Sequence, residues 1–524
     1  MNAADDSHAP QDSPHPLWTA CVGFCLLLAI LTMTVFTVRF AATLSRGDLF
    51  EMTGMEAPPI YDVWKRKHGH PVYVWPQDHH GDVSFYNVGF YETYGAITSL
   101  LPFEGAAFVT SARMITVLAT TVGCLITYLT LGAVSAGRNL PHQRVFVASF
   151  AIFVWFGSSS TSWYALAVRP DMLSMCLVAA GLWCFVLSKR RRHEVIWLLL
   201  ASIGFGLAWW VKQSTIGVLC GAGLCCLIHQ RSLRAAVLLS APAAAIMAAT
   251  LLAGNRAYFY NVIELPSLSR IGFYVRVQFH YLPFSLVTNP LVWFLPLLCL
   301  EAWRRQRRPQ SASPTDGWRL VPELAFPAMV AVIWSVVCLL REGSDKNTLL
   351  EGYLALATWS AALLLVNWGH VFSHQLTRLA ACVLAATTVL FPLAQLVFFD
   401  RVGDLNIASA AESNSERDLA DFVRSLPKPL LAEHPFLNLP WCSTNNRYPA
   451  MVTDDMTMAI MQEAGHLEEH PFLAAIRNRE PVTIMAKNDS AIDHAARDAG
   501  YHLLSAPTGN ELDRYRFYGI APVR

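Results

Sequence analysis

The sequence predicts a mainly α-helical polytopic membrane bundle of about eleven spans, with a long first outer loop and a small C-terminal α/β domain. Three observations predict this fold class. Of the 524 residues, 54% are hydrophobic and only 15% are charged. The apolar residues gather in runs long enough to cross a bilayer. Lys and Arg gather in alternate loops between these runs.

The composition favours an integral membrane protein, because a soluble globular chain would carry about a quarter charged residues. The formal net charge is +1, which does not supply the strongly basic face that a nucleic-acid partner would need. All cysteines except Cys442 fall in apolar runs, where they act as small packing residues. Their spacing matches neither a disulfide framework nor a CxxC zinc site.

The spans are predicted from apolar runs, since a helix needs about 20 mostly apolar residues to cross a bilayer. The first run lacks a basic n-region and a small-residue cleavage site, so we expect an uncleaved anchor. Two runs, 172–188 and 195–211, reach across only as upright or slightly longer helices. The full set is 17–41, 108–135, 145–167, 172–188, 195–211, 214–229, 235–254, 285–302, 322–340, 350–367 and 378–399.

Sidedness follows from the positively charged loops. With a cytoplasmic N-terminus, the inner loops contain AGRNLPHQR, KRRRHE, HQRSLR, RRQRRPQ and GHVFSHQLTR, which hold most of the clustered charge. One signal opposes this orientation, because residues 1–16 lack Lys and Arg while Arg39 and Arg46 lie at the other end of the first span. The dense later loops outweigh it, so we expect the N-terminus inside and the C-terminal domain outside.

This topology divides the chain into a disordered tail (1–16), a membrane domain (17–399) with its first outer loop (43–107), and an outer C-terminal domain (400–524). In the last, ERDLADFVRSL and SAIDHAARDAG have helical periodicity. Ser490 is placed to cap the second of these helices and Gly500 to end it. The segments VTIMA, YHLLS and RYRFYGI predict strands.

Charged and amide side chains gather at the outer ends of the spans. A charge beside hydrocarbon costs several kcal/mol unless it is paired or faces a wet cavity. These residues therefore form interfacial anchors and structural ion pairs, or they line a charged cavity that suits a lipid-linked substrate with an anionic head. Arg would bind a phosphate bidentately and Lys as a point charge. The residues are Arg169, Asp171, Lys212, Gln213, Arg341, Asp345, Lys346 and Glu351.

The stretch WPQDHHGDVSFYN in the first outer loop offers metal-ligand types at Asp78, His79 and His80. Zinc requires three or four converging ligands, and adjacent side chains in an extended chain point apart. A complete local site is therefore not predicted. Asp78, one His and Glu56 could share a divalent metal ion, and the alternatives are a solvated loop or contact with a substrate. No cofactor is predicted as certain.

Several short motifs, taken in order, resemble the GT-C superfamily of polytopic membrane glycosyltransferases, which includes lipid A aminoarabinose transferases and protein O-mannosyltransferases. The first outer loop carries E-x4-Y and G-x3-Y in MEAPPIYDVWKRKHGHPVY, at Glu56, Tyr61, Gly69 and Tyr73. The segments SFYNVGFYETYG, AVRPDMLS, WWVKQST and SDKNTLLEGYLAL resemble those of a bacterial branch of the superfamily, and the likeness covers nearly the whole chain.

The resemblance implies an inverting hexosyl- or pentosyltransferase in the bacterial inner membrane. Such enzymes move a sugar from a polyprenyl-phosphate donor to a lipid, glycan or protein acceptor at the outer face. Some relatives bind a metal in the first outer loop. An acid of this loop deprotonates the acceptor, and basic residues neutralise the leaving phosphate.

Carried onto this sequence, the resemblance makes Glu56 the candidate base. Lys212, Arg169 and Lys346 become the candidate phosphate ligands. The other expected substrate contacts are Tyr86, Asn87, Asp171, Gln213, Asp345 and Glu351.

One departure from the family affects the base. The well-studied relatives have Asp-Glu where this chain has Met55-Glu56. If the missing Asp carries the chemistry there, Glu56 only assists. Alternative bases in the same loop are then Asp48, Glu51, Asp62 and Asp78.

Two other functions use the same features. A transporter or flippase of a lipid-linked or anionic solute also needs many spans and charged residues, but transporters tend to bind near the midplane between repeated halves. Here the charges collect at one face, and no second half resembles the first. A polymerase or ligase of surface polysaccharide would use the same lipid-linked donor and the same outer cavity.

Overall fold

The structure is a computed structural model that describes most residues of the chain. These are 16–46, 56–76, 83–135, 141–158, 161–190, 192–268, 281–305, 316–341, 346–367, 371, 375–397, 418–419, 421–427, 429–433, 461–462, 471–505 and 515–520.

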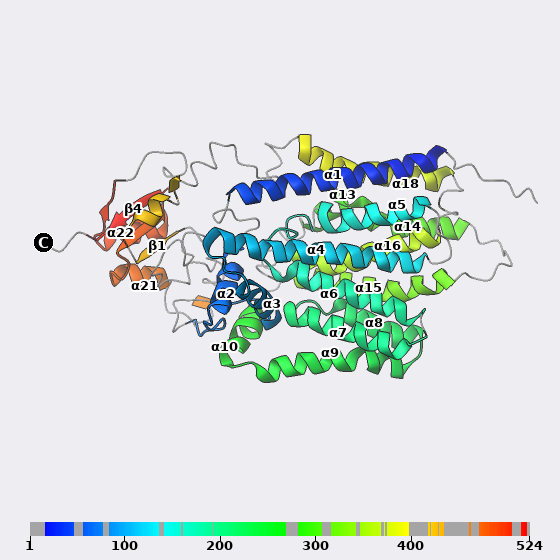
Figure 1. The fold of residues 1–524 in the computed structure, drawn as a ribbon, viewed down its shortest axis with the longest axis horizontal. Helices are drawn as coiled ribbons and strands as arrows, with labels where there is room; N and C mark the ends of the chain where they lie inside the picture. The colour runs from blue at the N-terminus through cyan, green and yellow to red at the C-terminus, as the bar shows by residue number, and fades with distance from the viewer. Residues whose placement is uncertain are drawn as a thin grey trace, which may run out of the picture.

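Most of the chain forms a bundle of roughly parallel and antiparallel helices, with a small separate α/β unit beyond one end (Figure 1). The mainly α fold predicted from the sequence is confirmed. The bundle helices are α1 (Pro16–Arg46), α4 (Gly105–Val134), α5 (Pro141–Ile152), α6 (Pro170–Ser188), α7 (Glu194–Val211), α8 (Gly217–Leu224), α9 (Leu233–Ala253), α13 (Tyr281–Thr288), α14 (Pro290–Arg305), α15 (Asp316–Leu339), α16 (Leu350–Val366) and α18 (Gln375–Val397).

Seven of the described helices, namely α1, α4, α6, α7, α9, α15 and α16, are long and apolar enough to cross a membrane. Shorter apolar helices cover Gly217–His229, Pro290–Glu301 and Gln375–Leu390. Each apolar run predicted above contains a described helix, while the number of spans stays a prediction. The helix α16 lies at the centre, with 89% of its most apolar window buried, against 28% for α9. Exposed Leu, Ile and Val side chains on the outer helices suit contact with lipid.

Glycines allow the central helices to approach closely. A Cβ added to Gly221 of α8 would lie 2.6 Å from the Phe326 carbonyl oxygen of α15. On Gly217, one turn earlier, it would lie 2.8 Å from Ala331 Cα of the same helix. Small residues spaced by four are typical of helix contacts in membranes, where van der Waals packing drives association. The contact of α8 with α15 therefore depends on these glycines.

One predicted run differs in the structure. The sequence predicts a single helix over 145–167, but in the structure α5 ends at Ile152 and is followed by a π-helical turn, η1 (Phe153–Gly157). Residues 161–169 follow as turns and bends, buried among the helices. The Ser158 hydroxyl accepts from the Thr161 backbone N–H at 3.1 Å. Such local side-chain hydrogen bonds compete with helix formation, and hydropathy alone does not register them.

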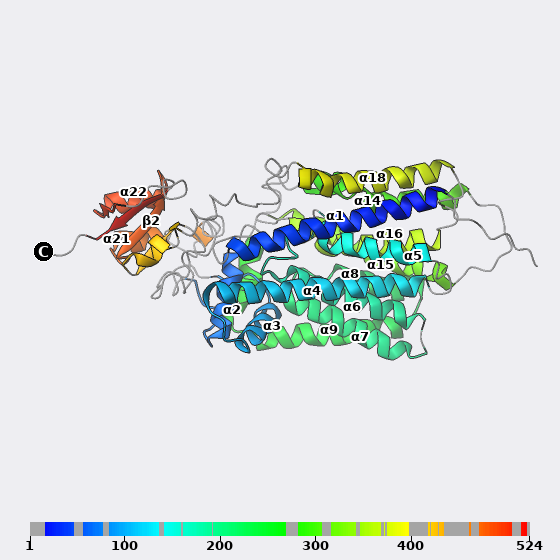
Figure 2. The same ribbon diagram turned by 45° about the horizontal axis from the view of Figure 1, so that its top comes forward.

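The first outer loop contributes two short helices, α2 (Ala57–Lys67) and α3 (Val88–Ser99), at the end of the bundle nearest the C-terminal unit (Figures 1 and 2). A further segment, 256–268, lies at the same end and consists of α10 (Arg256–Phe259), the π-helical turn η3 (Tyr260–Glu264) and α11 (Leu265–Leu268). Asn261 ties this segment to the loop: it accepts from the Ser84 backbone N–H and donates to the Val74 carbonyl, both at 2.9 Å. The sequence predicts that this end of the bundle faces outward, and we call it the outer end of the bundle.

The C-terminal unit has a four-stranded sheet of order β1-β2-β4-β3, formed by β1 (Leu430–Ala432), β2 (Thr483–Lys487), β3 (His502–Leu503) and β4 (Tyr515–Gly519). The pair β1–β2 is parallel, while β2–β4 and β3–β4 are antiparallel. Helices α21 (Pro471–Arg477) and α22 (Ala491–Asp498) lie beside the strands of this sheet (Figure 1). As the sequence predicted, the Ser490 side chain caps α22, and Gly500 follows it with φ of +76°.

Candidate functional site

Three charged residues meet at the outer end of α6 and α7. Lys212 Nζ lies 2.5 Å from Asp171 Oδ1, and Arg169 Nε lies 3.2 Å from Asp171 Oδ2. The side chain of Asp171 is fully buried, and those of Arg169 and Lys212 are 7% and 8% exposed. We call Arg169, Asp171 and Lys212 the outer cluster. It has one more positive charge than negative charge, and all three side chains are buried.

Helix ends position this cluster. Arg169 is the N-cap of α6, Pro170 follows at the first position, and Asp171 lies in the first turn. The fixed φ of proline suits that position, and an acid is stabilised at the positive end of the helix dipole. Lys212 is the C-cap of α7, where a cation is stabilised by the negative end. The antiparallel contact of α6 with α7 brings the two ends together.

Lys212 also connects the cluster to α16. Its Nζ donates to the Asn347 carbonyl at 3.3 Å, in the 3₁₀ turn η4 (Lys346–Leu349) that leads into this helix. An ammonium group has three donors. Two of them have acceptors among the described residues, so one donor remains for another acceptor.

Glu56 lies beside the outer cluster in a second buried ion pair. Arg113 of α4 donates to both of its carboxylate oxygens, from Nε at 3.1 Å and from a terminal nitrogen at 2.9 Å. The Val168 backbone N–H donates to Glu56 Oε1 at 2.8 Å. Glu56 is fully buried. It therefore fixes the backbone immediately before Arg169 to the start of α2 and to α4.

Glu351, on the other side of the cluster, caps a helix. Its Oε1 accepts from the Val218 backbone N–H at 2.8 Å, at the start of α8. The residue before this helix, Ile216, supplies no side-chain cap. A carboxylate is favoured at a helix N-terminus, so this contact gives Glu351 a structural role beside the site.

Gln213, Asn87 and Tyr86 are predicted to contact substrate, and in the structure all three make hydrogen bonds within the protein. Gln213 donates to the Phe85 carbonyl at 2.7 Å. Asn87 caps α3 at the Val88 N–H and donates to the Trp209 carbonyl at 2.9 Å. The Tyr86 carbonyl accepts from the Tyr73 hydroxyl at 2.8 Å. The hydrogen bonds of Gln213 and Asn87 hold the start of α3 against the end of α7, while the hydrogen bond of Tyr73 lies within the loop itself.

Tyr258 of α10 extends this contact. Its hydroxyl donates to Asn87 Oδ1 at 2.6 Å. Burial raises the pKa of Tyr258 from its ordinary value of about 10 to about 12, so this hydroxyl is a donor at neutral pH, like that of any tyrosine, and stays one at moderately alkaline pH.

Some predicted residues lie outside the description. Lys346 begins η4, but its side chain is not described. The described residues include no group of three or more His, Cys, Asp and Glu side chains placed to hold a metal ion. Residues outside the described ranges are Asp345 among the substrate contacts, Asp78, His79 and His80 of the metal hypothesis, and Asp48 and Glu51 among the alternative bases.

Asp62, the remaining alternative base, is buried and lies 2.6 Å from Lys65 Nζ. Lys65 also donates to the Val72 carbonyl at 3.0 Å, so this pair closes the turn after α2.

Sequence reasoning missed Arg113. It lies inside the predicted run 108–135, and a charge within a span tends to face the protein interior and pair with an opposite charge. That rule could have paired it with an acid of the outer loop. The contacts of Val168 and Asn347 are made by backbone atoms, and no side-chain pattern reports them.

Comparison with solved structures identifies the fold. ArnT from Cupriavidus metallidurans bound to undecaprenyl phosphate is similar with a TM-score of 0.54 and 11% identity, over 94% of this chain and 98% of that chain. ArnT from the same organism in the apo state gives 0.53 and 13%, over 95% and 98%. No protein-family model matches the sequence, and no curated protein matches it. The chain therefore has the fold of ArnT along nearly its whole length.

Proposed function

We propose that this protein is an inverting glycosyltransferase that moves a sugar from a polyprenyl-phosphate donor to an acceptor at the outer end of the bundle. The observation that carries the proposal is the outer cluster, in which two cations share one carboxylate beneath the outer end. The shared fold with ArnT, bound to undecaprenyl phosphate in its solved structure, supports a donor of this class. A multi-pass membrane location follows from the apolar helices.

In this proposal Lys212 and Arg169 receive the phosphate. As the bond between the anomeric carbon and the phosphate oxygen breaks, its electron pair stays on the phosphate, whose charge becomes more negative. Lys212 offers its remaining donor, and Arg169 offers a second positive charge held in place by Asp171. Charge-assisted hydrogen bonds of this kind stabilise a leaving phosphate most when the site is dry.

The acceptor oxygen forms the new bond on the opposite face of the sugar, which inverts the anomeric carbon. Its proton passes to a carboxylate. Protonation of Glu56 would remove the negative charge that pairs with buried Arg113 and would weaken the hydrogen bonds from Arg113 and Val168. We therefore propose that Glu56 acts as a positioning residue that holds the backbone before Arg169. Asp48, Glu51 and Asp78 then remain the candidate bases. The alternative is that Glu56 itself is the base, and a double-mutant cycle of Glu56 with Arg113 distinguishes the two roles.

The experiment uses purified full-length protein in lipid with a panel of radiolabelled polyprenyl-phosphate sugars. Hexose and pentose donors, each with and without candidate acceptors, cover both proposed transferase types. Loss of label from the carrier, by hydrolysis or transfer, supports an enzyme. Binding or translocation of intact donor without cleavage contradicts the proposal and supports the transporter alternative. Chain growth on a glycan acceptor identifies the polymerase or ligase alternative.

A further inference from the structure

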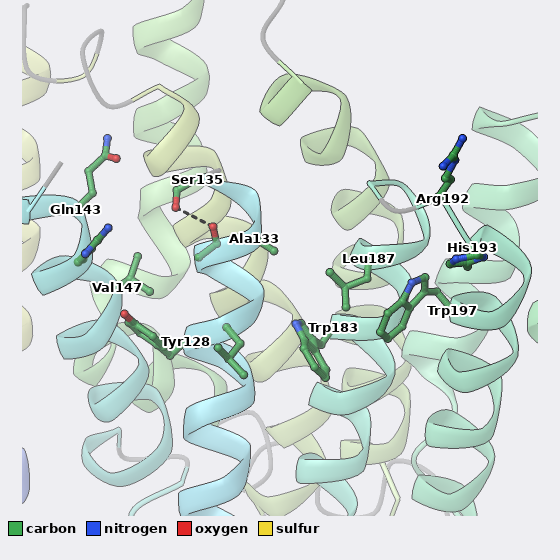
Figure 3. Close-up of a pocket in the computed structure, with 13 residues that line it drawn as sticks. Tyr128, Ala133, Ser135, Gln143, Val147, Trp183, Leu187, Arg192, His193 and Trp197 are labelled. Atoms are coloured by element: carbon green, nitrogen blue, oxygen red, sulfur yellow. Dashed lines mark hydrogen bonds between the residues drawn. The ribbon is translucent and has the colours of Figure 1, made fainter. Parts of the chain in front are cut away.

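A cavity of about 810 Å³ lies at the end of the bundle opposite the outer cluster. It forms where α4 and α6 end and where α5 and α7 begin (Figure 3). The proposed transfer reaction uses none of its residues. In the sequence, the predicted inner loops AGRNLPHQR and KRRRHE connect α4 to α5 and α6 to α7, and their charge predicts that this end faces the cytoplasm.

The deeper wall of the cavity is apolar. Trp183 and Trp197 meet there edge to face, with ring centroids 6.2 Å apart. Leu187 adds aliphatic surface to the same wall. The space beside Gly132 is open, because a Cβ added there would meet no atom within 4 Å. This wall offers a slot for an apolar chain.

The rim of the cavity is cationic. Arg144 and Arg192 are exposed residues that line it, and His193 lies next to Arg192 (Figure 3). No Asp or Glu belongs to the residues that line the cavity. The cavity thus has charged groups at the helix ends and aromatic rings deeper in the bundle. A lipid has the same arrangement, with a charged head group at the membrane surface and an acyl chain below it.

A buried amide gives an independent sign of a ligand. Gln143 lines the cavity and is 3% exposed. Its amide oxygen has no hydrogen-bond partner among the described residues. A buried acceptor without a donor is unfavourable, so a ligand that brings a hydroxyl donor would stabilise this site.

We propose that this cavity binds an anionic glycerophospholipid with a hydroxylated head group from the adjacent leaflet. The phosphate lies between Arg144 and Arg192, and a head-group hydroxyl donates to Gln143. One acyl chain lies along Trp183, Trp197 and the space beside Gly132. Phosphatidylglycerol has this chemistry and serves as the probe.

The test uses the two tryptophans as reporters. Full-length protein is placed in bilayers that contain phosphatidylcholine and increasing fractions of phosphatidylglycerol with brominated acyl chains, which quench nearby indoles. The variant Trp183→Phe/Trp197→Phe supplies the background from the other tryptophans. We expect a saturable quenching component that is about tenfold stronger for brominated phosphatidylglycerol than for brominated phosphatidylcholine. It should be absent from the reference variant.

Matched variants separate a site from general surface charge. Arg144→Gln/Arg192→Gln should remove the preference for phosphatidylglycerol, and Gly132→Phe should fill the slot and remove the saturable component. Arg234→Gln removes an exposed charge at the start of α9, outside the cavity. This variant should keep both the preference for phosphatidylglycerol and the saturable quenching component. Thermal unfolding of each variant checks that it is folded.

Three results would overturn the proposal. The first is equal quenching by the two lipids. The second is an effect of Arg234→Gln as large as that of the cavity arginines. The third is loss of the component on adding millimolar inorganic phosphate, which would assign the site to a soluble phosphate.

Discussion

Buried ion pairs dominate the site at the residue scale, and each links segments far apart in the sequence. The pair of Glu56 with Arg113 joins the first outer loop to α4, and Lys212 with Asp171 joins α7 to α6. Removing one member of a buried pair leaves the other charge uncompensated and costs about 3–5 kcal/mol. A loss of activity alone therefore cannot separate chemistry from stability at these positions.

The role of Glu56 is tested with a double-mutant cycle. Glu56→Gln alone should destabilise the protein by about 3 kcal/mol, because Arg113 stays buried and charged. In Glu56→Gln/Arg113→Gln the amide oxygen can still accept from Val168, so stability and most of the transfer rate should return. Thermal unfolding and initial rates are measured for all four proteins. If the double variant folds normally but is inactive, Glu56 is the base rather than a positioning residue.

Lys212→Ala should raise the donor KM about tenfold or more, since a hydrogen bond to a charged group contributes about 1.5–3 kcal/mol. Lys65→Ala is the matched control, because Lys65 is another buried lysine paired with an aspartate, in the turn after α2. The control should lose stability and keep its donor KM. An unchanged donor KM in folded Lys212→Ala would reject the phosphate contact.

The sequence predicted which charged residues gather at the outer end, but not how they pair. Arg169, Asp171 and Lys212 could be placed together because their spans are antiparallel neighbours joined by short turns. The cap that Glu351 forms on α8 could not be predicted. It depends on the packing of α16 against the start of another helix, which no local pattern in the sequence reports.

Helix packing decides the arrangement at the element scale. Apolar runs predicted the helices well, since each run contains one. They did not predict the end of the third helix at Gly157, where serine and threonine hydroxyls bind the backbone. Nor did they indicate which helix is central, because α16 and the peripheral α9 are both strongly apolar.

The contact of α8 with α15 gives a test at this scale. Gly221→Val should destabilise the protein by about 1–3 kcal/mol or more, since its Cβ would overlap backbone atoms of Phe326 and Pro327. Gly23→Val is the control, because a Cβ there meets nothing within 4 Å. The comparison is made by thermal unfolding in detergent. Equal unfolding temperatures would show that the two helices do not approach as closely as described.

At the scale of the whole molecule, a polar network stabilises the C-terminal unit. Burial alone would raise the pKa of Asp493, but hydrogen bonds from Tyr518, the Asp489 N–H and Arg497, with Arg516 nearby, hold its pKa below the ordinary value. Arg516 lies 2.8 Å from the carboxylate. The network joins α22 to β4, so the ionised carboxylate supports the sheet.

A depressed folded pKa sets the sign of the pH dependence. The stabilisation is complete above the ordinary aspartate pKa of about 3.9 and is lost as pH falls through the folded value. Hydrogen exchange of the full chain should show β2 and β4 losing protection below about pH 4. In Asp493→Asn, β2 and β4 should lose this protection already at pH 7. Asp489→Asn is the control, because Asp489 is exposed, and it should show wild-type protection. Wild-type protection in Asp493→Asn would contradict this account.

The domain division predicted from the sequence stays a prediction, as does the orientation in the membrane. Both rest on composition, which reports where a segment prefers to lie but not what it contacts. One buried apolar cluster includes Val83 and Tyr260 of the outer end together with Leu431 and Ile484 of the C-terminal sheet. Long-range packing of this kind has no signature in the local sequence.

We propose that the outer end of the bundle breaks the bond between a sugar and a polyprenyl phosphate. The most direct test of this proposal follows the anomeric carbon of a ¹³C-labelled donor by NMR, with purified protein in lipid and an acceptor found in the donor panel. We expect a product of inverted configuration, formed by the wild type and by Lys65→Ala, and formed slowly by Lys212→Ala at low donor concentration. A donor that binds but stays intact, or a product that retains its configuration, would contradict the proposal.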